Sequence, residues 1–125
     1  MGLPSNGEEL TEARRNKYVM GETVRKAGVR AVKQTLATSM SDVEAFLADH
    51  NPTPFMCVVK PVQSAGTDDV FLCTTPDEAR KGFRTIYGKK NGIGLINEAV
   101  LIQEFLKGTE YVIDSVSLHG VHKVV

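Results

Sequence analysis

Residues 55–71 constrain the fold most, because an apolar run, a loop of small and polar residues and a second apolar run follow one another directly. The first run, residues 55–59, is too short for a typical helix and is rich in residue types that favour strands. Pro61 follows Lys60 and cannot donate to a strand ladder, so we expect strand pairing to weaken there. The segment therefore predicts a buried strand, a loop and a second strand at residues 70–73.

Lys60 lies at the mouth of the predicted loop, which continues through Ser64, Ala65, Gly66 and Thr67. Small residues let backbone amides approach a ligand closely, and successive amides can form a concave anion site. A lysine beside such a loop is suited to binding phosphate. The alternative is a polar hairpin in which Lys60 is simply solvated, and the loop residues alone leave both interpretations open.

The part of the chain before this segment predicts a flexible lead, a helix and a strand. Residues 1–11 are polar and contain two glycines and a proline, which is typical of a disordered N-terminal lead. Residues 16–27 carry apolar side chains at helical spacing, and Gly28 follows as a helix stop. Residues 29–36 have the composition of a strand.

Two sequence patterns of the capping-box type predict the starts of two further helices. One runs from Ser41 to Glu44, and the other runs from Thr75 to Glu78 with Pro76 at the first helical position. The apolar residues that we expect these helices to bury are Val43, Phe46 and Leu47 in the first, and Ala79, Phe83, Ile86 and Tyr87 in the second.

The C-terminal part predicts a loop at residues 89–97 and further strands at residues 99–103, 110–118 and 121–125. Because a domain rarely ends on an unpaired apolar strand, we expect this chain to be part of a longer protein. Together the elements predict an α+β fold, with a four-stranded antiparallel or mixed sheet, helices on one face, and a preceding helix.

The composition narrows the classes of partner. The chain has 125 residues with 15 basic and 15 acidic side chains, so its net charge of zero offers no simple electrostatic attraction to nucleic acid or to an anionic membrane. No apolar run approaches the length of a membrane span. We therefore expect a cytoplasmic protein with neither kind of partner. Cys57 and Cys73 lie in strand-like runs, which favours buried free thiols over a disulfide or a metal site.

Three segments, taken in order, resemble the ATP-grasp superfamily. They are Asn16-Lys17-Tyr18 through Gly28, Val58-Val59-Lys60-Pro61 with the small-residue loop, and the stretch from Leu101 to Tyr111. The chain is similar to the carboxylate–amine or thiol ligases of this superfamily, such as amino-acid ligases, biotin carboxylase and carbamoyl-phosphate synthase. The resemblance implies that residues 12–125 form part of an ATP-grasp domain, namely its first subdomain and the start of the second.

The resemblance also implies a role for individual residues. Lys17 matches a lysine that lies near the nucleotide, and Lys60 matches the lysine that contacts the phosphates. The loop that would fold over the phosphates comprises Ser64, Ala65, Gly66 and Thr67. The hinge that would hold adenine comprises Gln103, Glu104, Phe105 and Leu106, with a neutral amide at Gln103 where the family often has glutamate. Glu110 matches the acid that binds the ribose hydroxyls.

As a function, the resemblance implies an ATP-dependent ligase that activates a carboxylate as an acyl phosphate, which an amine or another nucleophile then attacks. ATP and Mg²⁺ would be required, together with small carboxylate and amine substrates. We expect the magnesium ligands and the catalytic residues to lie outside this chain, so that the chain alone is inactive. A noncatalytic interaction module and a nucleotide-sensing domain are the alternatives.

Overall fold

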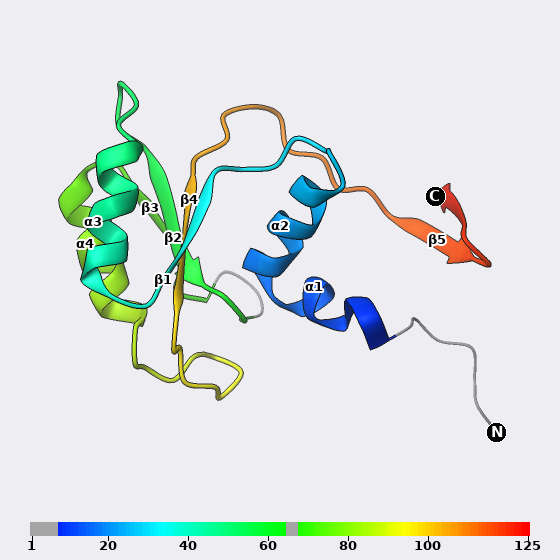
Figure 1. Ribbon diagram of the computed structural model, residues 1–125, viewed down its shortest axis with the longest axis horizontal. Helices are drawn as coiled ribbons and strands as arrows, with labels where there is room; N and C mark the ends of the chain where they lie inside the picture. The colour runs from blue at the N-terminus through cyan, green and yellow to red at the C-terminus, as the bar shows by residue number, and fades with distance from the viewer. Residues whose placement is uncertain (1–7, 65–67) are drawn as a thin grey trace.

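The computed structural model describes residues 8–64 and 68–125, and Figure 1 shows how their helices and strands are arranged. In chain order the elements are η1 (Glu8–Leu10), α1 (Thr11–Arg15), α2 (Lys17–Lys26), β1 (Gln34–Ala37), α3 (Met40–Asp49), β2 (Cys57–Pro61), β3 (Phe71–Cys73), α4 (Pro76–Ile86), β4 (Val100–Glu104), β5 (Ser115–Leu118) and β6 (Val121–Val124).

Four of the strands form one sheet in the order β1-β4-β2-β3, and each pair of neighbours is antiparallel. Helices α3 and α4 cover one face of this sheet, whereas α1 and α2 lie on its other side (Figure 1). This arrangement confirms the predicted α+β class and the four-stranded sheet. The predicted preceding helix is α2. Residues 8–11, which were predicted to belong to a disordered lead, are instead helical in η1 and at the start of α1, and residues 1–7 lie outside the described residues.

The hydrophobic core lies between the sheet and the pair α3 and α4. Alternate residues of β2 point into it, because Cys57 and Val59 are buried whereas Val58 and Lys60 are partly exposed. Gly82 lets α4 approach the sheet closely, since a Cβ atom there would lie 3.3 Å from Val59. The helical residues of the core are Val43, Phe46, Leu47, Ala79, Phe83 and Ile86.

The start of α3 corrects one predicted cap. The helix begins at Met40, its N-cap is Ser39, and the capping box joins Ser39 to Asp42 rather than Ser41 to Glu44. The Asp42 carboxylate accepts from the backbone amides of Thr38 and Ser39, at 2.8 and 2.9 Å. An aspartate at the third helical position therefore does here what glutamate usually does, and it moves the helix start two residues towards the N-terminus.

The second predicted cap is confirmed, although the burial predicted at the end of its helix is wrong for one residue. Thr75 caps α4 by accepting from the Glu78 amide, with Pro76 at the first helical position. The helix ends at Ile86, so Tyr87 falls outside the buried stripe, is 41% exposed and stacks on Phe83.

Two predicted strands are shorter in the structure. Of residues 29–36, pairing begins at Gln34, because the neighbouring strand β4 ends at Glu104, next to Lys33. Of residues 110–118, only the last four form a strand, β5, which pairs with β6 in a separate two-stranded sheet. His119 and Gly120 connect them with positive φ values of 49° and 76°, as a tight hairpin turn requires.

Cys57 and Cys73 are free, buried and directly opposite each other in the β2–β3 pair, which confirms the expectation of buried thiols. Within residues 8–64 and 68–125, no helix is long and apolar enough to cross a membrane.

Candidate nucleotide-binding site

The N-terminus of α2 places Lys17 beside the segment that follows β2. Asn16 caps the helix, because its side-chain oxygen accepts from the amides of Tyr18 and Val19. The Lys17 amide donates to the Val62 carbonyl oxygen at 3.2 Å, and the Lys17 Nζ donates to the Ser64 carbonyl oxygen at 3.0 Å. Lys17 is therefore fixed at both its backbone and its ammonium group.

Lys60 lies on the same side of the sheet as α2. Its neighbours along β2, Val59 and Pro61, are buried towards the core, so the alternation of the strand directs Lys60 to the opposite face. Burial lowers the pKa of Lys60, and the positive charge of Lys17 lowers it further. Burial also lowers the pKa of Lys17. Two partly desolvated cations thus lie near each other, an arrangement that an anion would stabilise.

A network of side-chain amides joins α2 to the sheet. The Gln34 Nε2 donates to the Tyr18 carbonyl oxygen and to the Glu22 carboxylate, both at 2.9 Å. The Gln103 Nε2 donates to the Gln34 Oε1 at 2.8 Å. At Gly21 a Cβ atom would come within 2.6 Å of the Gln34 Nε2, so glycine allows this close approach. The network holds α2, and with it Lys17, over β1 and β4.

The predicted hinge comprises the last two residues of β4, Gln103 and Glu104, and the two residues that follow it. Glu104 is held to the start of β1 by two contacts with Lys33, because its amide donates to the Lys33 carbonyl oxygen and its carboxylate accepts from the Lys33 amide. Phe105 and Leu106 come next and are 38% and 67% exposed. In the β2–β4 ladder, Lys60 pairs with Leu101 and Val58 pairs with Gln103. The first hinge residue, Gln103, therefore lies two strand residues from the partner of Lys60, roughly 7 Å along the sheet.

The remaining predicted site residues have fewer contacts with the two lysines, Lys17 and Lys60, or lie outside the described residues. Glu110 is exposed, and no hydrogen bond or ion pair links it to Lys17 or Lys60 in the part of the chain that the structure describes. Ser64 contributes its carbonyl oxygen to Lys17, and its hydroxyl is buried without a hydrogen-bond partner among the described residues. Ala65, Gly66 and Thr67 lie outside the described residues.

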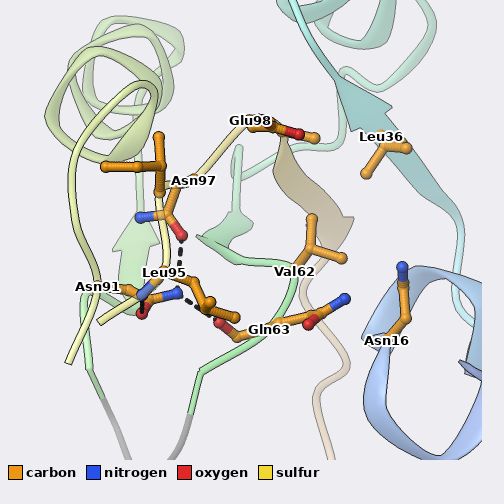
Figure 2. A pocket seen from close by; sticks show the side chains of 10 residues that line it. Asn16, Leu36, Val62, Gln63, Asn91, Leu95, Asn97 and Glu98 are labelled. Carbon is orange, nitrogen blue, oxygen red and sulfur yellow. Dashed lines mark hydrogen bonds between the residues drawn. The ribbon is translucent and has the colours of Figure 1, made fainter. Parts of the chain in front are cut away.

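A pocket of about 460 Å³ continues from this face beyond the end of β2 (Figure 2). Its lining residues are Asn16, Leu36, Val62, Gln63, Asn91, Leu95, Ile96, Asn97, Glu98 and Ala99. The sequence analysis predicted residues 89–97 only as a loop and missed Asn91 and Asn97, which are 7% and 5% exposed. A signal was available for Asn91, since an asparagine directly before a glycine, here Gly92, is typical of tight, side-chain-stabilised turns.

Within residues 8–64 and 68–125, no three His, Cys, Asp or Glu side chains gather closely enough to hold a metal ion.

Known proteins resemble this chain over most of its length. It is 43% identical to dapdiamide A synthase of Enterobacter agglomerans over 116 residues, which is 93% of this chain and 27% of that protein. It is 27% identical to alanine–anticapsin ligase of Bacillus subtilis, over 97% of this chain and 28% of that protein. The chain therefore spans little more than a quarter of the length of these relatives.

Solved structures share the fold. D-alanyl-alanine synthetase A from Vibrio cholerae superposes with a TM-score of 0.74 at 15% identity, over 94% of this chain and 34% of the other. D-alanine–D-alanine ligase from Helicobacter pylori gives a TM-score of 0.59 at 18% identity, over 88% of this chain and 32% of the other.

The family itself is identified by sequence. Residues 15–122 match the family described as phosphoribosylglycinamide synthetase, ATP-grasp (A) domain. This match covers both lysines, the Gln34–Gln103 network and the hinge, and it confirms the resemblance inferred from the three sequence segments. The chain belongs to the ATP-grasp family.

Proposed function

We propose that this chain supplies part of the nucleotide site of an ATP-dependent ligase that activates a carboxylate as an acyl phosphate. The observation that carries the proposal is that Lys17, whose Nζ donates to the Ser64 carbonyl oxygen just beyond β2, is close enough to Lys60 for its charge to lower the pKa of Lys60. In the proposed reaction a carboxylate oxygen takes the γ-phosphoryl group of ATP, ADP leaves, and an amine then displaces phosphate from the acyl group.

In this proposal the two lysines bind and orient the phosphates. Each ammonium is partly desolvated, and Lys60 is further disfavoured by Lys17, so a polyanion between them offsets both penalties. Lys17 has three donors, which allows it to keep its bond to the Ser64 carbonyl oxygen while it donates to a phosphate. The buried Ser64 hydroxyl is a further donor at the same place. Ala65, Gly66 and Thr67 are proposed as the loop over the phosphates.

Residues at the end of β4 would hold adenine and ribose. The Glu104 amide is occupied by the Lys33 carbonyl oxygen, so the base edge would be paired by the Glu104 carbonyl and the Leu106 amide. Gln103 uses its amide nitrogen on Gln34, and its oxygen is the end that could accept from the exocyclic amine. Phe105 would contact the base, and Glu110 would accept from the ribose hydroxyls.

Magnesium belongs to the proposal only as a prediction about other parts of the protein. The described residues offer no carboxylate cluster that fits Mg²⁺, so no step proposed here relies on a metal ligand from this chain. We likewise propose that the small carboxylate and amine substrates are bound mainly by regions outside the described residues.

The proposal is tested by titrating the chain with ATP while backbone amide NMR shifts are followed. We expect shifts concentrated at residues 60–64 and 103–106, and we expect Lys60→Ala to remove most of the response. The matched control is Lys81→Ala, since Lys81 is an exposed lysine of α4 on the other side of the sheet. Equal ATP binding by the Lys60 variant, or no shift at these residues in the unsubstituted chain, would overturn the proposal.

A further inference from the structure

Residues 62–64 present three consecutive carbonyl oxygens, and each one accepts from a side chain or amide outside the segment. The Val62 oxygen accepts from the Lys17 amide, and the Ser64 oxygen accepts from the Lys17 ammonium. The Gln63 oxygen, between them, accepts from the side-chain Nδ2 of Asn91 at 2.7 Å. The segment is therefore held from one side by α2 and from the other by the loop before β4.

Asn91 is suited to this task because its own position is fixed. Its Oδ1 accepts from the amides of Ile93 and Leu95, and its backbone amide donates to the Leu95 carbonyl oxygen. Its Nδ2 also donates to the Oδ1 of Asn97, whose own Nδ2 reaches the Ile86 carbonyl oxygen at the end of α4. Figure 2 shows Asn91 between Asn97 and Gln63, with Gln63 extending from there towards Asn16. Asn91 thus connects the core helix α4 to residues 62–64.

A second contact ties the same loop to the chain just before β3. The Gly92 amide donates to the Asp68 carboxylate at 2.6 Å. A Cβ atom at Gly92 would lie 2.8 Å from that carboxylate oxygen, so a larger residue would displace the Asp68 side chain. Neighbouring residues of one loop, Asn91 and Gly92, therefore hold Gln63 and Asp68.

We infer that Asn91 is a positioning residue for Lys17, and that it acts through the carbonyls of residues 62–64. The inference rests on the proposed function for the ligand, since a phosphate chain is what the positioned lysines would bind. Asn91 itself touches neither lysine. Its hydrogen bond to Gln63 fixes the middle carbonyl, and the flanking carbonyls are the acceptors that orient Lys17.

The test compares Asn91→Ala with Asn97→Ala in the full chain. Both variants remove a buried asparagine from the same loop, but only Asn91 donates to Gln63. The first readout is hydrogen exchange of the Lys17 amide. This amide belongs to the first helical turn, where no partner within the helix is available, so its protection reports the contact with Val62. We expect exchange about tenfold faster in Asn91→Ala and little changed in Asn97→Ala.

The second readout is the ratio of ATP affinity to adenosine affinity, measured by calorimetry. If Asn91→Ala disturbs the position of Lys17, its affinity for ATP should fall by about tenfold while its affinity for adenosine stays within about twofold. If the substitutions merely loosen the loop, the ratio of ATP to adenosine affinity should change equally in both variants. If Asn91→Ala does not fold, Asn91→Asp replaces it, because its oxygen still accepts from Ile93 and Leu95 while the donor to Gln63 is lost.

Unchanged Lys17 exchange in the Asn91 variant, or equal effects of both variants, would overturn the inference. If the unsubstituted chain binds no ATP, the proposed function fails for this chain, and the exchange readout alone then decides whether Asn91 positions Lys17.

Discussion

The Gln103 side chain donates to the Oε1 of Gln34 across the β1–β4 pair, and the Gln34 nitrogen in turn donates to the Tyr18 carbonyl oxygen in α2. These side chains lie on the sheet face that also carries Lys60. The two hydrogen bonds therefore hold α2 against this face, next to Lys60. Gln103 therefore helps to place α2, and it is also a residue that we propose to contact adenine.

Replacing Gln34 by leucine should weaken the attachment of α2. The Tyr18 carbonyl, the Glu22 carboxylate and the Gln103 amide would each lose a partner, which we expect to destabilise the chain by about 1–3 kcal/mol. Thermal unfolding followed by circular dichroism measures this change. Gln63→Leu is the control, since the side chain of Gln63 lines the pocket outside this network. A Gln34 variant as stable as that control would show that the relay carries no stability.

Replacing Lys60 by methionine should stabilise the ligand-free chain while it weakens ATP binding. The lowered pKa means that the charged form of Lys60 is disfavoured in the folded state, so its charge reduces stability below that pKa, and the penalty disappears as pH rises towards the ordinary lysine value of 10.5. We expect a gain at pH 7 of no more than about 1 kcal/mol, because the partly exposed ammonium is screened by water.

The measurement is urea unfolding at pH 7 and pH 10, where the gap between Lys60→Met and the unsubstituted chain should narrow. Lys81→Met is the control on α4. A variant that loses stability at pH 7 would show that the lysine is well solvated in the folded state.

Acid should unfold the chain partly through its helix caps. Backbone and hydroxyl hydrogen bonds from Thr38 and Ser39 lower the pKa of Asp42, and those from Thr74 and Thr75 lower the pKa of Glu78. A carboxylate with a lowered folded-state pKa contributes stability above its ordinary pKa and loses it as pH falls through the lowered value, so the loss lies below about pH 4.

The double variant Asp42→Asn, Glu78→Gln should therefore be less stable at pH 7 and show a flatter dependence of melting temperature on pH between about 7 and 3. Glu98→Gln, in the pocket lining, is the control. Parallel pH profiles for the double variant and the unsubstituted chain would contradict the role of the caps.

Two neighbouring residues at the end of α4, Ile86 and Tyr87, differ strongly in burial. Ile86 is fully buried in the core, whereas Tyr87 is 41% exposed. We expect Ile86→Ala to cost about 2–5 kcal/mol and Tyr87→Ala to cost about 1 kcal/mol, mainly through its stacking on Phe83. Chemical denaturation of both variants measures the difference, and equal losses would place Tyr87 in the core after all.

The residues that the sequence predicted well are those where a local pattern and the fold agree. Helix α2 occupies Lys17–Lys26, within the predicted residues 16–27, and Thr75 caps α4 as predicted. The prediction failed where a distant partner decides the outcome. β1 begins at Gln34 because β4 ends at Glu104, and no local pattern contains that information.

The candidate site follows the same division. Lys60 was predicted from its place before the small-residue loop and from the family resemblance, whereas Lys17 was predicted from the resemblance alone. The Gln34 relay and the contacts behind the proposed role of Asn91 required the tertiary structure. Asn91 illustrates the reason, since its side-chain amide donates to Gln63, 28 positions away. An asparagine directly before a glycine indicates a tight turn but does not identify such a distant partner. The nucleotide roles of the hinge residues and of Glu110 stay predictions.

The strand order has a consequence for how the chain folds during synthesis. β4 is the last strand of the four-stranded sheet along the chain, yet it lies between β1 and β2. On the ribosome, β2 and β3 can pair early as neighbours in sequence, whereas β1 emerges first and must wait for β4, its partner in the described sheet. The strand that carries the hinge is thus also the one that closes the sheet, and closing such a distant pair is the slow, entropically costly step expected of nonlocal contacts. Completion of the sheet therefore depends on the five residues Val100–Glu104, and these include Gln103 and Glu104 of the proposed hinge.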